Sequence, residues 1–424
     1  MRNVLVIAYY FPPLGLSGVQ RTLKFVKYLE QFGWQPTVLT IGNVAYFAKD
    51  ESLLKELDGL NIEIIRTDSL DPNTVLRKRN KDNVVRLPKE RTQKLYRMLT
   101  DLFFIPDNKI GWKRHALKAA GTLLEKKKFD VIFATSPPQT AFIIGRKLKE
   151  KYKIPLVIDY RDAWVDYPFK WYPTPLHKYL NIRKERKVLR AADSILTASR
   201  RVKEFILRRY KFLSYNDVQL LPQGFDPADM VVEERGLLPI TEKMRITYSG
   251  TFYEDRTPLY FFEALSLVFK NHPKMRGRIE ACFVGAFRTE HINLVNKLQL
   301  QDSVNILGYL EHKETVKYLL ASDVLWVMMQ DDLSSPGKIF EYIGTGKKIL
   351  GCVPEGNIRH LIQEANGISA EPKNVRQIAD AIAALYHQYE QKELRGARSE
   401  IIDKYNRVHL TGELAKVFTA HLEV

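Results

Sequence analysis

Short apolar runs and longer amphipathic segments alternate along most of the chain. Residues 4–9 are largely apolar. After a loop, the segment from about Val19 carries apolar side chains at helical spacing until Gly33, and a second apolar run follows at 37–41. Apolar runs of this length predict buried strands, and the amphipathic segments between them predict helices that cover a sheet. The sequence therefore predicts an α/β fold built on parallel strands.

This alternation runs through two series, separated by a break in the pattern near residue 222. Predicted strands lie at 4–9, 37–41, 62–65, 130–135, 154–158, 194–197 and 218–221 in the first series, and at 245–250, 279–284, 304–307, 324–328 and 348–353 in the second. We expect two Rossmann-like, doubly wound domains that face each other across a ligand-binding cleft. The expected bounds are 1–222 for the N-terminal domain, 223–243 for a linker, 244–399 for the C-terminal domain and 400–424 for a terminal helix that packs back onto the first domain.

Composition and length agree with a globular protein of two domains. The 424 residues include 45% apolar and 27% charged residues. Only Cys282 and Cys352 are present, so neither a disulfide framework nor a zinc cluster is expected. The N-terminus leads directly into a strand without a signal peptide, and no apolar run is long enough to cross a bilayer. We expect a cytoplasmic protein whose contact with a membrane is peripheral.

The positive charge is concentrated in the first half. Residues 1–222 contain 42 Lys and Arg against 22 Asp and Glu, whereas residues 223–424 contain 24 against 27, which gives the net charge of +17. Basic residues cluster at 77–97, in a stretch that predicts an exposed insertion, and again at 183–203; apolar and aromatic residues at 96–104 follow the first cluster. This combination favours an anionic membrane surface as a partner, and a merely solvated basic surface is the alternative.

Residues 334–346 carry the clearest candidate chemistry. This stretch leaves an apolar run and opens a helix, where Ser335 and Gly337 let backbone amides approach an anion. Lys338 adds a positive charge, and the carboxylate of Glu341 lies about one turn further along the helix. A phosphate with vicinal hydroxyls fits this arrangement. A capped surface helix with a chance lysine and glutamate is the structural alternative.

Other candidates lie where a predicted strand ends. Asp159, Arg161 and Asp162 follow the strand at 154–158, at the sheet edge where open α/β proteins bind ligands. These residues are candidates for a reaction centre. A structural pairing of aspartate with arginine is the competing interpretation.

Two glycine turns are further candidates. Ser17 and Gly18 precede the first predicted helix and can bring its start against a diphosphate or an acceptor group, although an ordinary helix cap is the favoured interpretation of these two residues alone. Gly250 and Thr251 follow the first strand of the second series in the same way.

Five motifs stand in the order found in a known family. They lie at 9–13 with 17–19 and Arg21, at 159–164, at 221–226, at 248–251 and at 336–346. Together they span nearly the whole chain and resemble the family 4 glycosyltransferases, which have the GT-B fold of two Rossmann-like domains.

The resemblance implies roles for the candidates. Glu341 matches the glutamate that holds the ribose hydroxyls of the donor nucleotide, and Lys338 with Arg256 stands for the paired basic residues on its diphosphate. The expected catalytic residues are Lys338 and Arg256, from the resemblance, and Asp162 and Arg161, from their place at a strand end. The expected binding residues are Glu341, Gly337, Ser335, Gly250 and Thr251, together with Gly18 and Ser17, whose loop lies across the cleft from the donor in the family.

The chain departs from the family pattern at two places. Leu333 stands eight positions before Glu341, where relatives have a glutamate for the donor sugar; Asp331 or Asp332 is a substitute, or the donor sugar is unusual. Where many relatives have a histidine near the anomeric carbon, this chain has Arg161 followed by Asp162. The identity of the sugar therefore does not carry over.

The implied reaction is glycosyl transfer from a nucleoside-diphosphate sugar to a glycan or lipid-linked acceptor, with retention at the anomeric carbon. It would belong to the synthesis of a bacterial surface polysaccharide or glycoconjugate, on the cytoplasmic face of the membrane. The main task is to stabilise charge on the departing β-phosphate. No cofactor is expected besides the donor substrate, and no metal, because the nine histidines show no ligand spacing.

Other classes of function remain open at this point. A GT-B sugar-nucleotide epimerase would share the architecture and would turn over a sugar nucleotide without an acceptor. A non-catalytic, polyanion-binding protein would explain the basic first half. Nucleic acid is not an expected partner, because the sequence contains no RNP, KH or helix-turn-helix signature.

Overall fold

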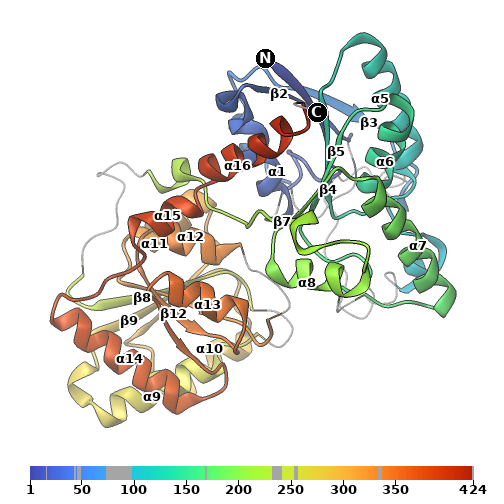
Figure 1. Ribbon diagram of the computed structural model, residues 1–424. Coiled ribbons are helices and arrows are strands. Elements are labelled where there is room, and N and C mark those ends of the chain that lie inside the picture. Colours follow the sequence, from blue (N-terminus) through green and yellow to red (C-terminus); the bar gives the residue numbers. More distant parts are fainter. Residues whose placement is uncertain are drawn as a thin grey trace. The chain divides into compact units, whose positions relative to one another are not determined.

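The structure is a computed structural model that describes residues 1–15, 17–42, 44, 49–72, 98–167, 170–231, 241–252, 256–332 and 337–422. The chain divides into two compact units, one of Met1–Gln223 with Leu410–Val424 and one of Gly224–His409. Each unit is a parallel sheet with helices on both of its faces (Figure 1). The predicted α/β class is confirmed.

The first unit contains a sheet of seven strands in the order β3-β2-β1-β4-β5-β6-β7. The strands are β1 (Arg2–Ile7), β2 (Trp34–Ile41), β3 (Glu63–Thr67), β4 (Val131–Ser136), β5 (Leu156–Tyr160), β6 (Ser194–Thr197) and β7 (Val218–Leu220). Neighbouring strands pair in parallel, so their carboxyl ends lie at one edge of the sheet. The strand order reverses between β1 and β4, which makes this pair the topological switch point.

Helices connect these strands. They are α1 (Ser17–Tyr28), α2 (Ser52–Lys55), α5 (Trp112–Lys126), α6 (Thr140–Tyr152), α7 (Pro175–Ala191) and α8 (Arg200–Arg209), with short 3-10 turns at Leu29–Phe32 and Tyr215–Asp217. Helix α5 packs beside α6, and α6 beside α7. Helix α16 (Arg407–Thr419) begins in the second unit and continues into the first, where the ring of Phe418 contacts those of Trp34 and Phe133 at centroid distances of 5.2 and 5.5 Å.

The second unit contains a sheet of six strands in the order β10-β9-β8-β11-β12-β13, again paired in parallel. The strands are β8 (Met244–Ser249), β9 (Ile279–Val284), β10 (Val304–Gly308), β11 (Val324–Met328), β12 (Lys348–Cys352) and β13 (Ile368–Ala370). The switch point of this sheet lies between β8 and β11. The helices are α9 (Leu259–Asn271), α10 (Thr289–Lys297), α11 (His312–Leu320), α12 (Lys338–Gly344), α13 (Asn357–Glu364), α14 (Val375–Glu390) and α15 (Ser399–Lys404), with 3-10 turns at Pro227–Met230 and Pro273–Met275.

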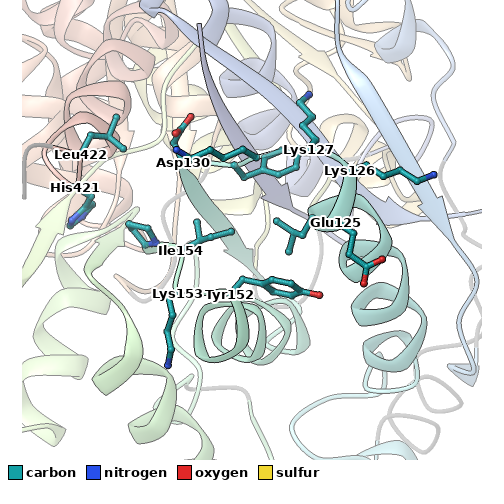
Figure 2. A pocket seen from close by; sticks show the side chains of 13 residues that line it. Glu125, Lys126, Lys127, Asp130, Tyr152, Lys153, Ile154, His421 and Leu422 are labelled. Carbon is teal, nitrogen blue, oxygen red and sulfur yellow. The ribbon is translucent and has the colours of Figure 1, made fainter.

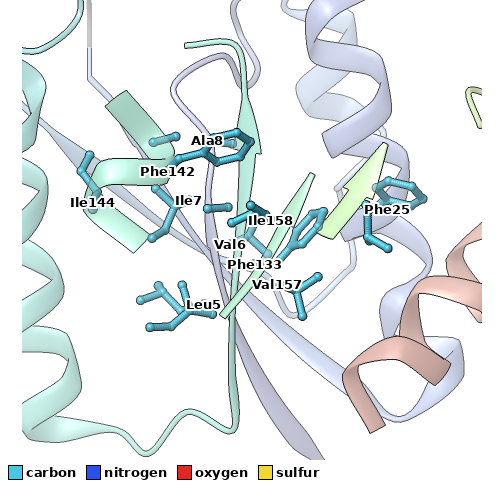
Figure 3. Close-up of a cluster of buried hydrophobic side chains, with 14 of the residues drawn as sticks. Leu5, Val6, Ile7, Ala8, Phe25, Phe133, Phe142, Ile144, Val157 and Ile158 are labelled. Carbon is cyan, nitrogen blue, oxygen red and sulfur yellow. The ribbon is translucent and has the colours of Figure 1, made fainter. Parts of the chain in front are cut away.

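The core of the first unit forms where the central strands meet the helices. Figure 3 shows side chains of β1, β4 and β5 packed between Phe25 of α1 and Phe142 of α6. Residues 4–7 of β1 are completely buried, which explains their continuous apolar run, since helices cover both faces of this strand. Burial of each such side chain stabilises the fold by roughly 1.5–3 kcal/mol. The rigid sheet fixes the positions of the loops at its edge.

Several element boundaries differ from the prediction. Strand β5 continues through Asp159 and Tyr160, whereas the sequence predicted its end at residue 158. Helix α1 begins at Ser17, so Gly18 lies in the first helical turn and not in a loop. Strand β13 was not predicted, because its three residues are too few for a periodic signal. The predicted insertion lies mostly in 73–97, outside the described residues.

Candidate active site

Lys338 lies at the switch point of the second sheet, where α12 begins. Its Nζ donates a hydrogen bond to the carbonyl oxygen of Ser249, the last residue of β8, at 2.8 Å, and lies 4.0 Å from the ring centroid of Tyr248. The pKa of Lys338 falls to about 7, mainly because burial disfavours the charged form. The positive charge of Arg256 lowers this pKa further, and the carboxylate of Glu341 opposes the shift. Lys338 and Arg256 are thus close enough to influence each other's charge, which makes this place a candidate site for an anion.

Gly250 leaves room for the lysine side chain. Its φ of 131° is one that other residues rarely adopt, and a Cβ at this position would lie 2.7 Å from the Nζ of Lys338. Gly285, directly after β9, must also be a glycine, because a Cβ at this position would lie 2.1 Å from the carbonyl oxygen of Gly250. Thr251 follows and is exposed. At Gly250, where the Nζ of Lys338 lies, the turn after β8 therefore presents only backbone atoms.

Glu341 lies one turn after Lys338 on α12, with its side chain partly buried. Burial raises the pKa of its carboxyl group, while the charges of His312, Arg407 and Lys338 lower it and that of Asp229 raises it. His312 Nε2 lies 3.5 Å from Asp229 Oδ2. The carboxylate thus sits in a polar, charged environment, which suits a group that accepts hydrogen bonds from hydroxyls.

Sequence reasoning missed the residues around Glu341. Asp229 follows Pro227 in a 3-10 turn, His312 opens α11 and Arg407 opens α16, so three distant segments converge on one carboxylate. No spacing or motif connects these positions. Only the fold brings them together.

Arg161 holds together the loops at the switch point of the first sheet. Its guanidinium donates to the carbonyl oxygens of Ser136, the last residue of β4, at 3.2 Å, of Pro137 at 2.6 Å, and of Gly18 in α1. Burial lowers its pKa, against the opposing charges of Asp159 and Asp162. Its hydrogen bonds to three backbone carbonyls give Arg161 a positioning role for these loops.

Asp162 differs from its neighbours because its side chain is exposed. The protein atoms around it raise the pKa of its carboxyl group, and the adjacent charge of Arg161 lowers it. Of the three candidates at this strand end, Asp162 is the residue that is exposed at the carboxyl edge.

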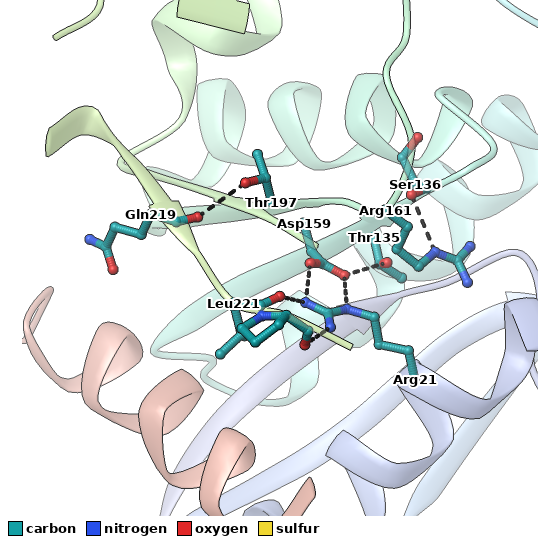
Figure 4. Close-up of polar contacts among 9 residues, drawn as sticks. Arg21, Thr135, Ser136, Asp159, Arg161, Thr197, Gln219 and Leu221 are labelled. Carbon is teal, nitrogen blue, oxygen red and sulfur yellow. Dashed lines mark hydrogen bonds and ion pairs between the residues drawn. The ribbon is translucent and has the colours of Figure 1, made fainter. Parts of the chain in front are cut away.

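Asp159 belongs to a buried ion pair, which is the structural interpretation of this residue. Its two carboxylate oxygens accept hydrogen bonds from Arg21 at 2.8 and 3.0 Å, and one of them also accepts from the Oγ1 of Thr135 at 2.9 Å (Figure 4). Arg21 also donates to the carbonyl oxygens of Leu221 and Pro222, at 2.8 and 2.7 Å. The pair connects α1, β4, β5 and the end of β7. This structural role explains the presence of Asp159 without a role in the chemistry.

Two family models together match most of the sequence. The model described as "Glycosyl transferase 4-like domain" matches residues 18–224, and the model described as "Glycosyl transferases group 1" matches residues 233–401. The chain belongs to the GT4-like glycosyltransferases. No curated protein sequence matched it.

Solved structures similar to this glycosyltransferase extend over its whole length. A glycosyltransferase from Rickettsia africae has 16% identity and a TM-score of 0.66, and the match covers 100% of this chain and 99% of that one. Anabaena HepE, solved with UDP, has 14% identity and a TM-score of 0.66, covering 99% and 100%. The lipopolysaccharide outer core galactosyltransferase WaaB has 12% identity and a TM-score of 0.58, covering 99% and 100%. The predicted GT-B fold is confirmed.

The remaining predicted site residues of the glycosyltransferase lie around the start of α12 or outside the described residues. Gly337 is exposed immediately before α12. Ser335 and Leu333 lie outside the described residues, as does the side chain of Ser17. Asp332, one of the two substitutes considered for the missing glutamate, accepts hydrogen bonds from the backbone N of Ile358 at 3.2 Å and so caps α13. Within the described part of the chain, no group of three or more His, Cys, Asp or Glu side chains could hold a metal ion.

A cavity of about 620 Å³ lies away from all these residues. It is lined by residues 124–130, 152–155, His421 and Leu422 (Figure 2). Residues 124–130 precede β4 and residues 152–155 precede β5, so the cavity lies at the amino edge of the first sheet. Ligands of parallel α/β sheets bind at the carboxyl edge. The cavity therefore takes no part in the candidate active site.

Replacing Asp159 with Asn tests whether this residue is structural. The change leaves the buried charge of Arg21 unpaired, so we expect the free energy of unfolding to fall by roughly 3–5 kcal/mol in urea denaturation. Asp302→Asn is the matched control, because its ion pair with Arg276 has half-exposed side chains, and we expect a loss of roughly 1 kcal/mol or less. Loss of transferase activity with unchanged stability in Asp159→Asn would assign it to the chemistry instead.

Proposed function

We propose that this glycosyltransferase moves a sugar from a nucleoside-diphosphate sugar to a glycan or lipid-linked acceptor, with retention of the anomeric configuration. The observation that carries the proposal is the partly buried Lys338, which shares the switch point of the second sheet with Arg256 and lies one helical turn before Glu341. Cations for a diphosphate and a carboxylate for ribose hydroxyls are the groups that such a donor needs.

The donor is expected to be bound at the carboxyl edge of the second sheet. Lys338 and Arg256 would contact the diphosphate, and the exposed backbone at Gly337 and around Gly250 allows its oxygens to come close. Glu341 would accept hydrogen bonds from the ribose hydroxyls. Anabaena HepE has been solved with UDP and with UDP-glucose, which supports a uridine nucleotide as the first donor to test.

The reaction breaks the bond between the anomeric carbon and the β-phosphate oxygen, and forms a bond from the same carbon to the acceptor oxygen. The acceptor's hydroxyl proton passes to the departing phosphate, so no protein nucleophile is required. Lys338 and Arg256 stabilise the negative charge that develops on the leaving group, and a partly buried ammonium does so more strongly than one in water.

The acceptor is expected at the carboxyl edge of the first sheet. Arg161 fixes the positions of Gly18 and of the loop after β4, and Ser17 starts α1 at the same edge. The exposed carboxylate of Asp162 is the group we assign to orienting the acceptor hydroxyl.

The place of action that we propose is the cytoplasmic face of a bacterial membrane, in the synthesis of a surface polysaccharide or glycoconjugate. The excess of basic residues in 1–222 supports it, since they attract anionic headgroups. Within the described residues, none of the helices has both the length and the apolar character that a membrane span requires.

A panel of nucleoside diphosphates and sugar nucleotides, tested by calorimetry, checks the donor site. We expect one of them to bind, and Glu341→Gln to weaken it by roughly one to two orders of magnitude, because hydrogen bonds to charged groups contribute about 1.5–3 kcal/mol. Glu393→Gln, an exposed glutamate after α14, is the control and should bind normally. Turnover of the sugar nucleotide without any acceptor would indicate an epimerase, and equal binding by both variants would remove the proposed role of Glu341.

The pH dependence of binding tests Lys338. Its pKa is about 7 in the free protein, and a bound diphosphate raises it, so binding above this pH requires uptake of a proton. From the titration of Lys338, we expect the affinity for UDP to level off below about pH 7 and to fall by up to roughly tenfold per pH unit toward about pH 9. Lys338→Arg, which stays charged, should flatten this dependence. An equally steep profile in Lys338→Arg would contradict the assignment.

A further inference from the structure

Large apolar side chains are exposed together on the first unit. They come from the helical residues 98–103 and from the segment that leads into α7. Phe103 is 74% exposed, Leu176 60% and Tyr179 58%. We call the whole set the apolar patch: Met98, Leu99, Leu102, Phe103, Trp171, Leu176 and Tyr179.

Hydrogen bonds connect the two segments of the apolar patch. His177 Nε2 donates to the carbonyl oxygen of Leu102 at 3.0 Å, and Lys170 Nζ donates to that of Pro106 at 3.2 Å. Residues 98–106 therefore lie against the start of α7, and the apolar side chains of both segments belong to one surface.

The apolar patch lies at the carboxyl edge of the first sheet. Helix α7 starts after the loop that leaves the carboxyl end of β5. The segment that follows 98–103 is fixed at the same edge, because the carboxylate of Asp107 accepts from the backbone N of Thr140 at 2.9 Å and from its Oγ1 at 2.8 Å, where α6 follows β4. This is the edge that carries Arg161 and Asp162.

A row of basic residues continues from the apolar patch along α7. After Leu176 and Tyr179, the exposed positions of this helix are all basic, and Lys178 lies between the two apolar residues. We call these residues the basic row: Lys178, Arg183, Arg186, Lys187 and Arg190. Glu185, the one acid in α7, is buried and accepts hydrogen bonds from Tyr210 at 2.7 Å and Tyr160 at 3.3 Å. The exposed face of α7 thus has no negative charge, and Asp101 is the acid that accompanies the apolar patch.

We infer that the apolar patch and the basic row together form the surface by which this protein docks on an anionic lipid bilayer. Aromatic and aliphatic side chains enter the interfacial region, and the basic row contacts anionic headgroups beside them. Charge complementarity selects this occupant, because a second copy of the chain would present the same positive row against this one. A nucleic acid would pair with the basic row and would leave the apolar patch in water.

The proposed docking surface rests on the proposed function, and it indicates from which side a lipid-linked acceptor would reach the protein. A lipid-linked acceptor emerges from the bilayer, and the apolar patch shares a sheet edge with Asp162. The sugar of the acceptor would therefore reach Asp162 while its lipid remains in the membrane.

Trp171 provides a direct test. The chain has five tryptophans, and the other four, Trp34, Trp112, Trp164 and Trp326, are at most 1% exposed, whereas Trp171 is 45% exposed. We expect vesicles of phosphatidylcholine with phosphatidylglycerol to shift the emission to shorter wavelength, and lipids brominated on their acyl chains to quench it. Trp171→Phe should still bind and should lose both signals. Binding in which Trp171 is not quenched would overturn the proposal.

Matched variants separate the two parts of the surface. Arg183→Gln, Arg186→Gln and Lys187→Gln together should weaken vesicle binding by roughly two orders of magnitude, since each basic residue near an anionic surface contributes about fivefold. The control replaces three exposed lysines of the second unit, Lys270, Lys297 and Lys313, with glutamine and should bind almost normally. Phe103→Ser with Leu176→Ser should also lose binding, while Ile292→Ser, a similarly exposed residue of α10, should not.

The same variants distinguish this proposal from the proposed function. UDP binding and transfer to a soluble acceptor should be unchanged in all of them, because none of the replaced residues lies in the candidate active site. Equal binding to neutral phosphatidylcholine vesicles, or no effect of either set of variants, would overturn the docking surface alone. A dimer in sedimentation that Phe103→Ser with Leu176→Ser dissociates, without vesicle binding, would assign the surface to a second copy.

Discussion

Parallel pairing of strands is the constraint on which the rest of the structure depends. Among the described strands, every neighbour in both sheets is parallel, so each sheet has one edge where all carboxyl ends meet. Loops at that edge leave the buried sheet at fixed places and are free to carry polar side chains. Where the strand order reverses, the connections after β1 and β4 in one sheet, and after β8 and β11 in the other, leave the sheet toward opposite sides. The candidate residues of this glycosyltransferase gather at these two points.

The two edges place charge in different ways. In the first sheet, Arg21 and Asp159 pair completely inside the protein and Arg161 is bound to backbone carbonyls, so these charges build the edge. In the second sheet, Lys338 is partly buried beside the like charge of Arg256, and its pKa falls accordingly. A cation held in this way gains more from an arriving diphosphate than from its present hydrogen bond to one carbonyl. The charges of Arg21, Asp159 and Arg161 at the first edge therefore have partners within the protein, whereas Lys338 and Arg256 at the second edge suit the diphosphate that we propose.

Much of the fold could be predicted from the sequence, because apolar runs and amphipathic segments depend on local spacing. The strands at 279–284 and 324–328 were predicted to the residue. The end of β5 was not, because a charged residue such as Asp159 is not expected inside a buried strand, and the Arg21 that pairs with it lies 138 residues away in sequence. The sequence indicated Lys338 and Glu341, which share a short motif. It could not indicate Asp229, His312 and Arg407 around Glu341, because separate elements supply them. The sequence did indicate a glycine turn at Gly250, and the backbone φ of 131° there explains the requirement for glycine.

The central claim is that the second sheet holds the donor's diphosphate and ribose through Lys338, Arg256 and Glu341. A crystal structure of the protein soaked with UDP tests it most directly. We expect diphosphate oxygens within hydrogen-bond distance of the Lys338 Nζ and the Arg256 guanidinium, with the ribose hydroxyls on the Glu341 carboxylate. UDP bound elsewhere, with Lys338 still on the carbonyl of Ser249 and Glu341 without contact to the nucleotide, would contradict it.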